Sequence, residues 1–158
     1  MTNKRFKLSH SIAGLLAIII GEGALVAAAP SGATAFLLML GAAVGAVVTL
    51  YVATEVIEEV RNATHMLTLL SVVAAEFVIF FMAQYWFLIT ISPDSFPTLS
   101  PDLSSLALHS VMVFVFNPLY LPATALGRTL LVINTASALG LVLFILQNVW
   151  EFQHKKAS

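Results

Sequence analysis

Two acidic residues, Glu22 and Glu76, lie about half-way along stretches that are otherwise apolar. An ionised carboxylate at the centre of a bilayer costs on the order of 3 kcal/mol or more, so each should be protonated, paired or in contact with water. No Lys or Arg lies at the same depth in the sequence. Together the two carboxyls could bind a proton or a cation. A structural hydrogen bond to a neighbouring backbone, hydroxyl or amide group is the competing interpretation.

A second polar pattern occurs near the carboxyl end. It comprises Asn134, Ser137, Leu141 and Asn148. Their spacings of three, four and seven residues place them on one face of a helix. Polar residues on a membrane helix either line a water-filled path or form hydrogen bonds with neighbouring helices. The spacing alone leaves both interpretations open.

Other kinds of chemistry have little support in the sequence. The chain has no cysteine, which excludes disulfides, thiolate metal sites and redox thiols. Of the histidines, only His109 lies deep within an apolar stretch. There is no phosphate-binding loop, no zinc-protease pair and no nucleophile with a matched base. We therefore expect no enzymatic activity, no metal site and no cofactor.

The composition indicates an integral membrane protein. The 158 residues are 59% hydrophobic and only 9% charged, whereas soluble domains carry about 25% charged residues. Almost the whole chain should therefore lie in the membrane. We expect the lipid bilayer as its partner, and no nucleic acid.

Four stretches are long enough to span a bilayer, which takes about 20 apolar residues. They cover approximately Ser9–Ala29, Thr34–Val56, His65–Ile91 and Ala123–Trp150. Gly41 and Gly45 in the second stretch form a GxxxG pattern that could pack closely on the first, or simply mark a helix rich in small residues. Tyr85 and Trp86 near the end of the third are typical of an interfacial belt.

Residues 103–126 are apolar but interrupted. The continuous part, Leu103–Phe116, has 14 residues, fewer than a spanning helix needs. Ser100 is a candidate N-cap before a first helical residue Pro101. The pattern predicts a half-helix that enters the bilayer and returns as extended backbone. Such backbone requires burial in protein or contact with water.

Charge placement distinguishes five spans from four. With a re-entrant half-helix, all basic residues except Arg128 are cytoplasmic: Lys4, Arg5, Lys7, Arg61, Lys155 and Lys156. The positive-inside rule favours this arrangement. We predict an all-α integral membrane fold with four transmembrane helices and a re-entrant helix and loop between the third and fourth. Both termini should be cytoplasmic, and we expect a prokaryotic plasma membrane.

The stretch Pro122–Arg128, PATALGR, resembles the turn and inner-helix start of potassium-channel pores, and the resemblance covers about residues 66–150. By this comparison, the position of the selectivity filter TVGYGD is occupied by Phe114, Val115, Phe116, Asn117, Pro118 and Leu119. The resemblance implies a pore-loop fold and a homotetramer. Residues 62–158 would form the pore-like unit, preceded by a two-helix hairpin over residues 1–61.

The filter position departs strongly from the family pattern. Phe116 and Pro118 replace the two glycines, and only Val115 matches. Because the family filter needs backbone angles that glycine adopts easily, the resemblance does not carry potassium selectivity. Asn117 could form a polar ring, or it could simply cap the half-helix that Pro118 ends. The apolar residues 114–116 could gate by dewetting or plug the axis.

These observations lead to one main hypothesis and two alternatives. The main hypothesis is a pore-loop channel of the potassium-channel type, conducting cations with altered or lost potassium selectivity. A monovalent cation is the candidate ion, and the polar face from Asn134 to Asn148 would line the cavity. One alternative is a proton- or cation-linked carrier that uses Glu22 and Glu76. The other is a non-conducting membrane protein that keeps the channel-like fold.

Overall fold

The computed structural model describes residues 32–57, 60 and 62–157, with isolated positions 13, 14, 17 and 20 before them. This part of the chain is helical and contains no strand. Its elements are α2 (Gly32–Ile57), α3 (Ala63–Ile91), the 3₁₀ turn η1 (Pro93–Ser95), α4 (Leu103–Phe114) and α5 (Ala125–Ala157). Apart from these four positions, the predicted first span lies outside the described residues, and so does Glu22.

Three of these helices are long and apolar enough to cross a membrane, as predicted. The qualifying segments Gly32–Ile57, Ala63–Ile91 and Ala125–His154 have mean hydropathies of 2.3, 2.3 and 2.2. At about 1.5 Å per residue, even the shortest exceeds the hydrocarbon thickness of about 30 Å. Helix α4 has 12 residues and a length of only about 18 Å. It is too short to span.

Local signals explain where α3 begins and ends. The side chain of Asn62 accepts a hydrogen bond from the backbone N–H of Thr64 at 2.9 Å, which caps the first turn. The helix ends at Ile91, one residue before the Ser92–Pro93 pair, because a residue preceding proline disfavours helical angles. The sequence predicted His65–Ile91, so the carboxyl end is confirmed and the start lies two residues earlier.

Helix α2 packs on α3 through a stripe of mostly small side chains. Its buried residues are Ala35, Leu38, Ala42, Gly45, Ala46, Thr49 and Ala53. Apart from the adjacent pair Gly45 and Ala46, successive members are three or four residues apart, which places them on one helical face. Gly45 of the predicted GxxxG pattern belongs to this stripe, and the buried residues of α2 cluster with those of α3. Small residues therefore bring α2 close to α3.

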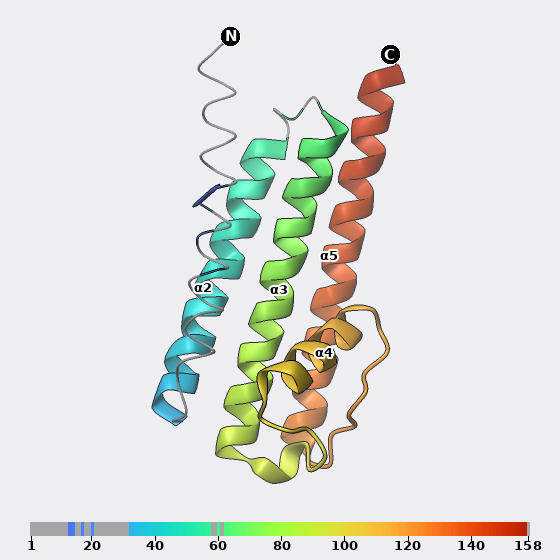
Figure 1. Cartoon of the computed structure of the whole chain (residues 1–158). Coiled ribbons are helices and arrows are strands. Elements are labelled where there is room, and N and C mark those ends of the chain that lie inside the picture. Colours follow the sequence, from blue (N-terminus) through green and yellow to red (C-terminus); the bar gives the residue numbers. More distant parts are fainter. Residues whose placement is uncertain are drawn as a thin grey trace.

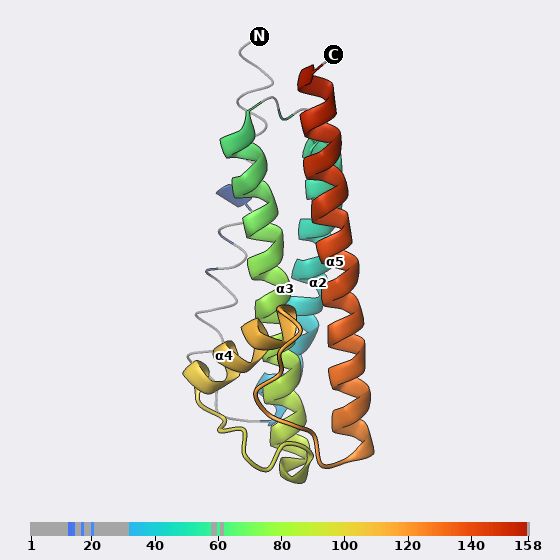
Figure 2. The same ribbon diagram turned by 90° about the vertical axis from the view of Figure 1, so that its right-hand side faces the viewer.

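Helix α3 lies at the centre of the described helices and contacts α2, α4 and α5. Figures 1 and 2 show α2, α3 and α5 running side by side, with α4 against one half of the bundle. The carboxyl end of α3 and the amino end of α5 lie at the same end of the bundle (Figure 1). Residues 92–124 thus leave the bundle and rejoin it at one end.

Candidate functional site

Helix α4 begins with an aspartate cap. The Asp102 carboxylate accepts hydrogen bonds from the backbone N–H of Ser105 at 2.9 Å and from the Ser104 hydroxyl. These hydrogen bonds, first that of Ser104, hold the pKa of the Asp102 carboxyl well below its usual range. The expected cap at Ser100 is therefore wrong by two residues. A carboxylate is a stronger acceptor than a hydroxyl at the positive end of a helix dipole.

The other end of α4 closes in a Schellman motif. The backbone N–H of Asn117 donates to the carbonyl of Met112 at 2.7 Å, and that of Phe116 donates to Val113 at 3.0 Å. The motif requires a left-handed residue after the helix, usually glycine. Here Phe116 takes that place with φ 62°. A residue that replaces a filter glycine in the family comparison thus adopts a glycine-like backbone conformation.

After α4 the chain returns as an irregular segment, residues 115–124, which we call the return stretch. Figure 2 shows it running from the carboxyl end of α4 back to the end of the bundle where α5 begins. A hydrogen bond joins its middle to α4. The backbone N–H of Tyr120 donates to Nδ1 of His109 at 3.4 Å. The His109 ring also lies against Tyr85, Phe96 and Tyr120, with centroid distances of 4.6, 5.6 and 5.4 Å.

The end of the return stretch is tied to η1. The backbone N–H of Ala123 donates to the carbonyl of Ser95 at 3.0 Å, and the hydroxyls of Ser95 and Thr124 share a hydrogen bond of 2.9 Å. Thr124 also accepts from the backbone N–H of Gly127 at 3.1 Å, which caps the start of α5. A Cβ on Gly127 would approach the Ser95 carbonyl oxygen to 3.0 Å. The PATALGR segment therefore positions α5 against η1.

The filter-position residues are mostly exposed within the single chain. Val115, Phe116 and Leu119 are 54%, 46% and 45% exposed. Asn117 is exposed as well, whereas Phe114 and Pro118 are partly buried. Asn117 takes part in ending α4 through its backbone N–H. Its side chain remains accessible beside a patch of apolar side chains, which lipid or a second protein surface would have to cover.

The polar face of α5 points largely towards α3. Asn134 and Leu141 are buried, whereas Ser137 and Asn148 are partly buried. Leu141 packs in a cluster with residues of α3, and Asn134 faces the hydroxyl of Tyr85 on α3. The shared face that the spacing predicted is therefore present on the helix. Its role as the lining of a pore remains a prediction.

Two polar residues on α3 are completely buried, and only one of them was expected to be. Glu76 is completely buried at mid-helix, a position consistent with the predicted buried acid. Tyr85 is completely buried too, so its assignment to an interfacial belt is wrong. Its ring packs edge-on against Phe96 at 5.3 Å and against His109 at 4.6 Å. The covering groups are the residue that follows η1 and a residue of α4, and no local sequence pattern indicates how these segments pack on α3.

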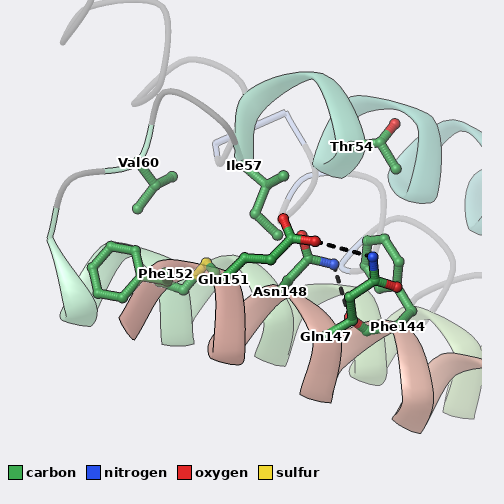
Figure 3. A pocket seen from close by; sticks show the side chains of 9 residues that line it. Thr54, Ile57, Val60, Phe144, Gln147, Asn148, Glu151 and Phe152 are labelled. Carbon is green, nitrogen blue, oxygen red and sulfur yellow. Dashed lines mark hydrogen bonds between the residues drawn. The ribbon is translucent and has the colours of Figure 1, made fainter. Parts of the chain in front are cut away.

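A cavity of about 210 Å³ lies near the opposite end of the bundle, between the last turns of α2, the start of α3 and the second half of α5. Figure 3 shows Gln147 donating to the Glu151 carboxylate at 3.0 Å and Asn148 donating to the Phe144 carbonyl at 2.8 Å. The remaining lining is mostly apolar, with Ile57 and Phe152 among its residues. The polar groups labelled here are thus already paired with neighbours on their own helix.

No family model, curated protein or solved structure matches this chain. Among the described residues, no three His, Cys, Asp or Glu side chains come together in a group that could hold a metal ion.

Proposed function

We propose that this protein is a membrane ion channel of the pore-loop type, conducting cations with altered or lost potassium selectivity. The observation that carries the proposal is the path of residues 92–124. This segment leaves α3 and enters α5 at one end of the bundle, with the short helix α4 and the return stretch between them. A half-helix followed by extended backbone between two spanning helices is the plan of a pore loop.

The direction of α4 favours a cation near its inner end. A helix carries partial negative charge at its carboxyl end, and here that end is followed by the exposed Asn117 side chain. In a homotetramer, four copies of the Asn117 amide would surround the axis and offer their oxygens to a monovalent cation. The apolar side chains of Val115 and Phe116 beside it would form a narrow constriction that hydrates poorly.

Assembly would also account for the exposed apolar surface of the return stretch. Val115, Phe116 and Leu119 are each about half exposed, and Leu121 is 73% exposed. Extended backbone at membrane depth is tolerated only where protein or water surrounds it. A ring of four subunits would place this surface against neighbouring copies. The same arrangement gives the backbone water or protein partners.

The proposal is tested by cation flux into liposomes that contain the purified full-length protein. We expect flux in the unmodified protein, and a changed rate or ion preference in Asn117→Ala and Phe116→Ala. Val47→Ala is the matched control, because Val47 is exposed on α2, away from the return stretch. Absence of flux for every monovalent cation would instead favour the non-conducting, channel-like alternative.

A second candidate function, a proton- or cation-linked carrier, is favoured by the complete burial of Glu76 in the middle of a spanning helix. A carboxyl at this depth is a functional candidate by default. Transport that disappears in Glu76→Gln while the protein stays folded would support the carrier. Transport that is unchanged in Glu76→Gln but altered in Asn117→Ala would support the channel.

A further inference from the structure

Three helices each contribute one buried polar side chain to the same place beneath α4. They are Tyr85 of α3, His109 of α4 and Asn134 of α5, with exposures of 0%, 0% and 1%. The Tyr85 and His109 rings meet edge to face at 4.6 Å. The Asn134 side chain faces the Tyr85 hydroxyl. We call these three residues the interior polar cluster.

Within the described part of the chain, the cluster leaves several polar atoms without a direct hydrogen-bond partner. They are the Tyr85 hydroxyl, Nε2 of His109 and both amide atoms of Asn134. A buried polar group without a partner is costly, and native proteins nearly always pair such groups with protein or with ordered water. The Asn134 side chain lies near the Tyr85 hydroxyl, but no hydrogen bond of good geometry pairs the two groups. Ordered water is the partner that native proteins commonly provide for such buried groups.

The donors and acceptors match the needs of one water molecule. His109 Nδ1 accepts the Tyr120 N–H, so in the neutral ring the proton resides on Nε2, which is then a donor. A water could accept that proton in a hydrogen bond and donate its own two hydrogens to the Asn134 carbonyl oxygen and the Tyr85 hydroxyl oxygen. Three partners is the usual number for a buried water.

We infer that Tyr85, His109 and Asn134 form a binding site for one internal water molecule, which joins α3, α4 and α5 in a single hydrogen-bonded network. Through His109 this network continues to the Tyr120 backbone. The site would therefore hold both α4 and the return stretch against the spanning helices. The inference requires no conduction and applies equally to a channel, a carrier or a non-conducting protein.

The most direct test is an experimental structure of the full chain at a resolution that reveals ordered water. We expect a water peak within hydrogen-bond distance of the Tyr85 hydroxyl, His109 Nε2 and the Asn134 amide. Absence of the peak, with the three side chains bonded directly to one another, would overturn the inference. The double variant Tyr85→Phe/Asn134→Leu should lose the peak, because it retains only one polar partner.

Thermal unfolding of the purified protein provides a second test that does not need a structure. Tyr85→Phe and Asn134→Leu should each lower the melting temperature, and the double variant should lower it by less than the sum. The amide of Gln reaches the place of Nε2, so the melting-temperature losses of His109→Gln and Asn134→Leu should remain non-additive when the two are combined. The shorter side chain in His109→Asn does not reach that place, so its loss and that of Asn134→Leu should simply add. Strictly additive effects in all pairs would contradict a shared water.

Discussion

The Nδ1 atom of His109 accepts a hydrogen bond from the backbone N–H of Tyr120, 11 residues further along the chain, at 3.4 Å. A side chain in the interior of α4 thereby gives a partner to the backbone of the return stretch. The two rings also lie 5.4 Å apart. Because a backbone N–H without a partner is costly where water is excluded, this contact contributes to keeping an irregular segment beside the bundle.

Replacement of His109 by Phe should therefore destabilise the protein. The substitution keeps an aromatic ring among Tyr85, Phe96 and Tyr120 but leaves the Tyr120 N–H without an acceptor. A fully buried donor without a partner costs roughly 1–3 kcal/mol, and this part-buried N–H should lie at the lower end of that range. The expected result is a lower melting temperature of the purified protein. A variant as stable as the parent would show that this hydrogen bond contributes nothing to the fold.

Gly127→Ala should destabilise the junction between η1 and α5. The added Cβ would lie 2.9 Å from Cβ of Pro122 and 3.3 Å from Cε2 of Phe96. Overpacking of this kind costs about 1–3 kcal/mol. Gly140→Ala is the matched control, because nothing lies within 4 Å of its added Cβ. In the middle of α5 it should stabilise by up to about 1 kcal/mol. Equal melting temperatures for both variants would contradict this account.

Phe116→Gly should raise stability, although it removes a large apolar side chain. The left-handed conformation of Phe116, with φ 62°, costs a non-glycine residue about 1–2 kcal/mol. Its side chain is about half exposed, so less packing is lost than in a core. Val115→Gly serves as the control, since Val115 has φ −95° and gains no relief. The free energies of chemical unfolding of both variants separate the relief of backbone strain from the loss of side-chain packing. Equal losses would argue against strain at Phe116.

The cap of α4 should respond to acid. Because hydrogen bonds lower the pKa of the Asp102 carboxyl below its ordinary 3.8, its contribution to stability is fully present above that value. The contribution declines as the pH falls below 3.8 towards the lowered pKa. Asn is an equally good N-cap and does not ionise. The protection of the amides at the start of α4, measured as the exchange rate relative to the intrinsic rate at each pH, should therefore fall in acid in the parent. If Asp102→Asn shows the same fall in protection, the carboxyl is not responsible.

Sequence patterns predicted those helices and helix ends that depend on neighbouring residues alone. The end of α3 at Ile91 follows from the proline after Ser92, and the long spans follow from their hydropathy. The start of α4 was misplaced because Ser100 and Asp102 are both good caps next to Pro101. Only the hydrogen bonds from Ser104 and Ser105 distinguish them, and these depend on the local backbone path.

The contacts that organise the candidate site were not predictable in the same way. Tyr85, His109 and Asn134 belong to three helices and share no spacing that would link them. Their proximity arises from how α4 packs on α3 and α5, which depends on the whole bundle. His109 stood out in the sequence only by its depth in an apolar stretch. The left-handed Phe116 was likewise hidden, because a large aromatic residue gives no signal for such a turn.

The most direct test of the proposed channel is disulfide cross-linking in the membrane. The chain has no cysteine, so Asn117→Cys introduces a single thiol, and a disulfide requires Cα atoms within about 7 Å. If Asn117 surrounds a four-fold axis, oxidation should link neighbouring subunits at residue 117. Leu37→Cys, at an exposed position on α2, should remain uncross-linked. A chain that remains monomeric when Asn117→Cys is oxidised would contradict the pore-loop assembly.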